Sequence, residues 1–303
     1  MEEKIDVSVI LVNYNTKDLT IACIDSIFSK TSGVKCEVIL VDNDSKDGSK
    51  EVFSNDERII FVESNENLGF GKANNLGLTK AKGKYIFFLN TDTLLVNNAI
   101  KDFFVFSESH SRDKIGGIGC LLENANNERI HSYAKFLSLK LELFDITIAH
   151  LYRMLNVAYK RYDTTEDDET KDFFHVDYVT GADLFVSKDI IDRFGAFDPD
   201  FFMYCEETEM QYRWTKNGYP SYIIKTPRII HLEGGSVNKS HEKFNIRKFI
   251  MGLESKKLYF KKTHGKIYNL LYRIISLHNI YVAWHHNFSK EQKKAVRQIV
   301  FSK

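Results

Sequence analysis

Four short apolar runs in the first 120 residues, each followed by a helix-like stretch, constrain the fold more than any other feature. The runs are rich in β-branched residues and lie at Val7–Val12, Glu37–Val41, Ile59–Glu63 and Tyr85–Leu89. Helical patterns follow at Lys17–Lys30, Ser45–Ser54, Gly71–Lys82 and Asn97–Ser109. Because the runs show little polar alternation, both of their faces should be covered. We therefore predict an α/β fold with a mostly parallel central sheet flanked by helices.

Polar residues follow each of these runs, at the carboxyl edge of the sheet where α/β folds bind ligands. The first of these turns, Asn13 to Thr16, contains no glycine. A dinucleotide-binding unit needs G-x-G-x-x-G at this turn, and no Walker A loop is present either. The sequence therefore disfavours both of those nucleotide-binding classes. The polar residues at the edge are Asn13, Tyr14, Asn15, Asp42, Asn43, Asp44, Asn65, Asn67, Asn90, Thr91 and Asp92.

The second half is less regular. We expect a strand at Ile115–Leu122, a helix at Leu139–Tyr162, an exposed acidic loop at Thr164–Asp172, a helix near Glu206–Asn217 and a strand at Arg228–Leu232. Basic amphipathic helices are expected from Lys243 to the end.

The two parts of the chain carry opposite net charge. Residues 239–303 contain 15 Lys or Arg and three acids, a net charge of +12, which leaves −11 on residues 1–238. We predict a catalytic domain at 1–238 and a basic helical region at 239–303. This region would face an anionic membrane surface, form a dimer through Ile267, Leu270, Leu271, Ile274 and Ile275, or be only a solvated lysine-rich face.

The cellular location expected from the sequence is the cytoplasm. The four cysteines form no C-x-x-C pair, and the acidic start MEEKIDVSVI is unlike a signal peptide. The most apolar segment, Ile267–Trp284, is interrupted by polar residues and is not expected to span a bilayer.

Several side chains could carry chemistry, and each also has a structural interpretation. Asp92 would suit Mg²⁺ or Mn²⁺, or simply end a turn. Asp42 could accept hydrogen bonds from a nucleoside or cap a helix, and Asp44 and Ser45 are expected to cap the next helix. His231 is either a metal ligand or a structural residue, and Gly234–Ser236 is either a mobile loop over a phosphate or an ordinary turn.

The acids Glu206, Glu207 and Glu209 suit the start of a helix, where its dipole favours negative charge. They also follow the apolar cluster Phe201–Tyr204, and an acid held against apolar surface gains the proton affinity that a general base requires.

Taken in order, seven segments from about Val7 to Ser236 resemble a family 2 glycosyltransferase of the GT-A fold, most closely the bacterial rhamnosyltransferase-like branch. They are VSVILVNYN, VILVDNDSKDGS, NENLGFGKANNLGL, YIFFLNTDT, VTGADLFVSK, FGAFDPDFFMYCEETEMQYRWTKNGY and IIHLEGGS. The basic C-terminal region lies outside the resemblance.

The resemblance implies a role for each matching position. Asp92 would bind the divalent metal, Mn²⁺ or Mg²⁺, as the only carboxylate of its motif, because Asn90 occupies the first position, and His231 would complete the site. The nucleotide would contact Asn13, Tyr14, Asn15, Asp42, Asn67, Gly69, Asn74 and Asn90. The acceptor side would include Gly181, Ala182, Asp183 and Glu206.

The catalytic base implied by the resemblance is Glu207, where the family usually has Asp in Glu-Asp-x-Asp. One extra methylene leaves the chemistry similar but makes the geometry less certain. The implied reaction is an inverting transfer from a nucleoside-diphosphate sugar, dTDP-rhamnose or a UDP-hexose, to a saccharide or lipid-linked acceptor in cell-envelope polysaccharide synthesis. We expect no nucleic-acid partner, and a location in the cytoplasm or on the inner membrane face. The alternatives are a nucleotidyltransferase and a non-catalytic nucleotide-sugar-binding member of the fold.

Overall fold

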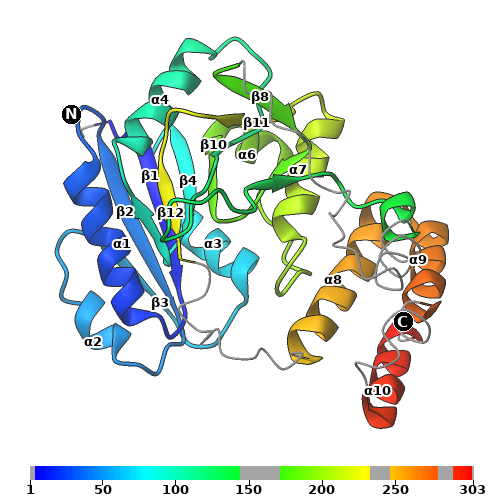
Figure 1. The fold of residues 1–303 in the computed structure, drawn as a ribbon. Helices are drawn as coiled ribbons and strands as arrows, with labels where there is room; N and C mark the ends of the chain where they lie inside the picture. The colour runs from blue at the N-terminus through cyan, green and yellow to red at the C-terminus, as the bar shows by residue number, and fades with distance from the viewer. Residues whose placement is uncertain (1–3, 144–170, 233–245, 279–288, 302–303) are drawn as a thin grey trace.

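The structure is a computed structural model that describes residues 4–143, 171–232, 246–278 and 289–301 (Figure 1). Its centre is an eight-stranded sheet in the order β3-β2-β1-β4-β10-β6-β11-β8. Neighbouring strands run parallel from β3 to β4 and between β6 and β11, whereas β10 and β8 run antiparallel to their neighbours. The prediction of a mostly parallel α/β sheet is confirmed. The strands are β1 (Val7–Asn13), β2 (Cys36–Asn43), β3 (Ile60–Ser64), β4 (Tyr85–Asn90), β6 (Gly117–Cys120), β8 (Phe173–Val176), β10 (Asp183–Ser187) and β11 (Ser221–Ile224).

Two hydrophobic clusters cover the two faces of this sheet, which explains why its strands lack polar alternation. On β1, Val9 and Leu11 belong to the cluster that includes Phe103 of α4, whereas Ile10 belongs to the other, with Trp214 of α7. The helices are α1 (Lys17–Lys30), α2 (Ser49–Phe53), α3 (Phe70–Leu78), α4 (Ala99–Ser109), α6 (Lys188–Phe194), α7 (Glu206–Lys216), α8 (Ile246–Thr263), α9 (Lys266–His278) and α10 (Lys290–Phe301).

Two small antiparallel sheets complete the fold. One pairs β5 (Thr93–Leu95) with β12 (Ile229–His231), and the other pairs β7 (Tyr133–Ala134) with β9 (Tyr178–Val179). The first continues directly from the end of β4 and therefore lies next to the carboxyl edge of the main sheet.

The predicted helix at Ser45–Ser54 begins too early. The structure starts α2 at Ser49, after Gly48 at φ +82°. Asp47 turns the chain here, because its carboxylate accepts from the Ser49 hydroxyl at 2.5 Å and from the Lys17 amide at 2.9 Å. The prediction that Asp44 and Ser45 cap this helix was therefore wrong.

The basic C-terminal helices pack against the main domain through a third hydrophobic cluster. It joins Phe201 and Cys205, which precede α7, to residues of α8, α9 and α10. Figure 1 shows these three helices on the α7 side of the molecule, far from α1 and α2. Among the described residues, no helix combines the length and apolar character needed to cross a bilayer. Most of the predicted helix at Leu139–Tyr162, most of the loop at Thr164–Asp172 and the Gly234–Ser236 turn lie outside the described residues.

Candidate active site

The carboxyl ends of β1 and β2 are joined by a buried polar pair. Asn13 lies opposite Asp42 in the parallel register, and its Nδ2 donates to Asp42 Oδ1 at 2.7 Å. The other Asp42 oxygen accepts from the Ser45 amide at 3.2 Å, and Ser45 Oγ accepts from the Asn15 amide at 3.0 Å. Asn13 is 0% exposed and Asp42 is 2% exposed. Both side chains hold the two loops together, and Tyr14 and Asn15 are the exposed groups at this end of the crevice.

The loop after β3 is fixed to the same edge by side-chain amides. Asn43 donates to Asn67 Oδ1 at 3.1 Å and accepts from the Leu68 amide at 2.8 Å. Asn74 is buried and donates to the Phe70 carbonyl of its own helix. Two asparagines near this loop were predicted to contact the nucleotide. Asn67 is partly accessible to solvent, whereas the buried Asn74 side chain is used in a hydrogen bond within its own helix.

Gly69 is the residue on which this loop depends. Its φ is +78°, and a Cβ added there would lie 2.0 Å from the Phe202 carbonyl oxygen. The same carbonyl accepts from the Phe70 amide at 3.0 Å. No other residue fits this contact, which joins the nucleotide-side loop to the segment before α7.

Asp92 and His231 come together although they lie far apart in sequence. His231 sits opposite Thr93 in the β5–β12 pair, and its Nε2 lies 3.1 Å from Asp92 Oδ1. Both side chains are partly exposed. Two donors in neighbouring positions of an octahedral ion lie about 3.0 Å apart when each bond is about 2.1 Å. Across the described ranges no group of three or more His, Cys, Asp or Glu side chains is placed to hold a metal. These two side chains fit Mn²⁺ or Mg²⁺ that takes its remaining ligands from phosphate and water.

The acidic residues at the start of α7 follow a strained turn. Tyr204 and Cys205 both have left-handed backbones, with φ of +71° and +63°. Such pairs of non-glycine residues are costly and persist where surrounding structure holds them. Burial, and for Glu206 the charge of Glu207 as well, raises the pKa of both Glu206 and Glu207 above the ordinary glutamate value. Glu209 instead forms an ion pair with Arg213 at 2.7 Å and is a structural residue.

The segment before β10 connects the Asp92–His231 pair to Glu206 and Glu207. The Asn90 amide donates to the Ala182 carbonyl at 2.9 Å, and a Cβ on Gly181 would lie 3.8 Å from Glu207 Cγ. Asp183, predicted on the acceptor side, is fully buried, and its Oδ2 accepts from the Cys120 amide at 2.7 Å. Burial raises the pKa of Asp183 to about 7. It supports the sheet rather than facing an acceptor.

Sequence reasoning missed the contact between the first loop and the metal loop. Thr16 Oγ1 lies 3.2 Å from Thr91 Oγ1 and also donates to Asn13 Oδ1 at 2.9 Å. A threonine in a polar turn carries no distinctive signal, so only the location of Thr91 beside Asp92 could have suggested it.

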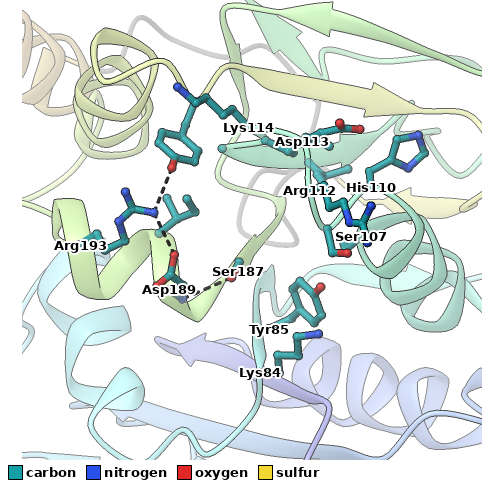
Figure 2. A pocket seen from close by; sticks show the side chains of 16 residues that line it. Lys84, Tyr85, Ser107, His110, Arg112, Asp113, Lys114, Ser187, Asp189 and Arg193 are labelled. Carbon is teal, nitrogen blue, oxygen red and sulfur yellow. Dashed lines mark hydrogen bonds and ion pairs between the residues drawn. The ribbon is translucent and has the colours of Figure 1, made fainter.

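A separate pocket lies at the opposite end of β4 (Figure 2). Its lining includes Lys84 and Tyr85, which begin that strand, whereas Asn90 ends it. Arg193 donates to Asp189 at 3.3 Å, which Figure 2 shows, and to the hydroxyl of Tyr219 at 3.0 Å. None of the predicted site residues lines this pocket. They gather instead at the carboxyl ends of the strands, which we take as the candidate active site.

Residues 8–144 match the family model described as Glycosyl transferase family 2. This segment, which is less than half of the chain, is similar to family 2 glycosyltransferases, and we call it the family 2 domain. It includes the crevice residues from Asn13 to Asp92, whereas Glu207 and His231 follow it in the chain. This match supports the family predicted from the motifs, and the rhamnosyltransferase-like branch remains a prediction.

Two curated relatives of the family 2 domain have named activities. The Escherichia coli UDP-Glc:alpha-D-GlcNAc-diphosphoundecaprenol beta-1,3-glucosyltransferase WfaP is 35% identical over 105 residues, 34% of this chain and 41% of that protein. The Haloferax volcanii low-salt glycan biosynthesis hexosyltransferase Agl10 is 24% identical over 212 residues, 69% of this chain and 61% of that protein. The aligned regions thus cover less than two thirds of either relative.

A solved structure supports the same fold over the whole chain. GalNAc-T7, crystallised with UDP, GalNAc and Mn²⁺, superposes with a TM-score of 0.65 at 16% identity, covering 100% of this chain and 55% of the other. The family 2 domain therefore lies within a GT-A fold, as predicted.

Proposed function

We propose that the chain is a metal-dependent, inverting glycosyltransferase that moves a hexose from a nucleoside-diphosphate sugar to a hydroxyl of a saccharide or lipid-linked acceptor. The observation that carries the proposal is that the Asp92–His231 pair lies on the same edge of the sheet as buried Glu206 and half-buried Glu207. The hydrogen bond from the Asn90 amide to the Ala182 carbonyl and the approach of Gly181 to Glu207 join the two. A crevice that only bound a nucleotide sugar would not need a carboxylate with raised proton affinity.

Glu207 is the proposed base. It would take the proton from the acceptor hydroxyl as that oxygen attacks the anomeric carbon, while the bond from this carbon to the diphosphate breaks with its electron pair. A divalent ion held by Asp92 and His231 would neutralise the negative charge of the leaving diphosphate. The loops tied by Asn13 and Asp42 would hold the nucleoside beside Tyr14 and Asn15, so that much of the acceleration comes from positioning.

A UDP-hexose is the donor that the comparisons favour over dTDP-rhamnose. The Escherichia coli relative is named for UDP-Glc, and GalNAc-T7 binds UDP with Mn²⁺. That relative is also named for a diphosphoundecaprenol acceptor. We therefore propose a lipid-linked acceptor and a location at the inner membrane face, with the chain attached peripherally.

Nucleotide release tests the proposal. The purified full chain is incubated with Mn²⁺ and, separately, UDP-glucose, UDP-galactose, dTDP-rhamnose and GDP-mannose, and released nucleoside diphosphate is measured with and without EDTA. We expect metal-dependent release of UDP from at least one UDP-hexose. Formation of nucleoside triphosphate and sugar 1-phosphate when pyrophosphate is added to the same donors would indicate a nucleotidyltransferase, and binding of a donor without turnover would indicate a non-catalytic member.

A further inference from the structure

Helix α9 presents a stripe of large aliphatic side chains to solvent. Ile267 is 74% exposed, Leu270 54%, Leu271 43% and Ile274 55%. Their spacing of three and four residues places them on one face of the helix. The opposite face is buried in the third hydrophobic cluster through Tyr272. Ile275, which the sequence placed in a possible dimer contact, is also largely buried.

A second copy of the chain is a poor occupant for this stripe, which we call the α9 stripe (Ile267, Leu270, Leu271 and Ile274). A helix of 13 residues is about 20 Å long, and a stripe about 10 Å wide on it offers roughly 200 Å². A stable interface needs about 800 Å² from each partner. The stripe is therefore much smaller than a dimer would require, but large enough for shallow insertion into a lipid surface.

Cations lie beside the stripe. Lys266 is exposed one residue before it, and Arg273 lies within its span. Arg273 Nε and Lys257 Nζ donate to the Val300 and Ile299 carbonyls at 2.5 and 2.9 Å, at the end of α10. Burial, with the charge of Arg273, lowers the pKa of Lys257. Lys266 thus places an exposed cation next to the aliphatic groups, within a region of net charge +12.

We propose that the α9 stripe inserts at the headgroup boundary of an anionic lipid membrane, an inference that rests on the lipid-linked acceptor of the proposed function. Aliphatic side chains gain by leaving water, and nearby Lys and Arg side chains are attracted to an anionic surface. The two contributions favour a lipid surface that is both apolar beneath and negative above.

Helix α8 links this surface to the catalytic segment. It packs along α9, and its Ser255 hydroxyl donates to the Met203 carbonyl at 2.6 Å. Lys262 pairs with Asp198 and Asp200, each at 2.6 Å. These bonds hold the segment that leads into Glu206 and Glu207. A membrane bound at α9 would therefore lie one helix away from the residues that receive the acceptor.

Vesicle co-sedimentation tests the inference without any nucleotide sugar. The full chain is mixed with vesicles of phosphatidylcholine alone or with phosphatidylglycerol added, at low and high salt. Leu270→Ser with Ile274→Ser is compared with Val52→Ser with Val105→Ser, which removes exposed aliphatic groups from α2 and α4. We expect the wild type and the control to bind anionic vesicles alike, and the α9 variant to bind at least about tenfold more weakly.

Three results would overturn the inference. The first is no wild-type binding to anionic vesicles, and the second is equal binding by the α9 variant. The third is a dimer, by light scattering, that the α9 variant converts to a monomer. Thermal unfolding of each variant confirms that it is folded, and metal-dependent release of nucleoside diphosphate without vesicles should be unchanged in the α9 variant. If the wild type itself released no nucleoside diphosphate, that result would instead count against the proposed function.

Discussion

The imidazole Nε2 of His231 lies 3.1 Å from Asp92 Oδ1, a distance fixed by the antiparallel pairing of β12 with β5. The His231 amide is also held by the Glu123 carbonyl at 2.8 Å, and the Leu232 amide by the Asp92 carbonyl at 2.9 Å. Backbone bonds on both sides thus position the two side chains before any metal arrives. Preorganisation of this kind lowers the cost of binding a metal and a diphosphate together.

Asp92→Asn should abolish metal-dependent turnover while leaving the fold intact. Asparagine keeps the shape of the side chain but removes the only carboxylate of the metal pair, so we expect at least about a hundredfold loss in kcat/KM. The measurement is the rate of nucleoside diphosphate release as Mn²⁺ is titrated. Asp192→Asn, on the exposed surface of α6, serves as the control. Near-normal activity in the Asp92 variant would mean that the metal site lies elsewhere.

Glu207→Gln should lower kcat by about a thousandfold with little change in the donor KM, because it removes the proposed base but not the nucleotide contacts. The pH profile gives a second readout. Burial raises the pKa of Glu207, and a base must be deprotonated to act. The wild-type rate should therefore fall on the acid side at a pH above the ordinary glutamate pKa of about 4.3. An acid limb at or below that value, or a Gln variant of normal kcat, would remove Glu207 from the mechanism.

The parallel half of the sheet could be predicted because its local and tertiary requirements agree. Val9, Ile10 and Leu11 pack on alternating faces, and both faces are covered, so an unbroken apolar run was a sufficient signal. The expected strands differ from the observed ones by one or two residues at their ends. The order of the antiparallel half was not predictable, since β10 reaches β4 and β6 through pairings that leave no mark in the local sequence.

The sequence predicted which residues lie at the candidate site, but not which of them are buried or bonded to each other. Position at the end of a strand indicated that Asn13 and Asp42 lie at the ligand edge, but it could not show that they bond to each other and are buried. Ser45 was misassigned for a related reason. Its hydroxyl accepts from Asn15, on a different loop, and such tertiary bonds override the capping preference of a serine.

Gly69→Ala should destabilise the protein and weaken donor binding. The added Cβ would sit on a backbone with φ of +78° and would lie 2.0 Å from the Phe202 carbonyl oxygen. The loop must therefore move away from Phe202. Gly265→Ala is a matched control, with φ of +88° and nothing within 4 Å of the added Cβ. The strain of the left-handed backbone alone costs about 1–2 kcal/mol. In chemical denaturation Gly69→Ala should lose at least about 1 kcal/mol more than the control. Equal losses would show that the contact with Phe202 is not maintained.

Glu206→Gln should stabilise the protein increasingly as the pH rises. Glu206 is buried, its Oε2 has no hydrogen-bond partner among the described residues, and burial raises its pKa. Between the unfolded pKa of about 4.3 and the raised folded pKa, the folded state holds more protons than the unfolded state. Stability therefore falls with pH in that window, by up to about 1.4 kcal/mol per pH unit, and a glutamine removes this loss.

Denaturant unfolding at pH 5 and pH 7 measures the effect, with Glu57→Gln at an exposed position as the control. We expect the free energy of unfolding of the Glu206 variant to exceed that of the wild type by a margin that is larger at pH 7 than at pH 5. The control should follow the wild type at both values, because the Glu57 side chain is exposed to solvent in the folded chain. A margin that is constant or shrinks with pH would mean that Glu206 is ionised at little cost, through a partner or water that reaches its buried oxygen.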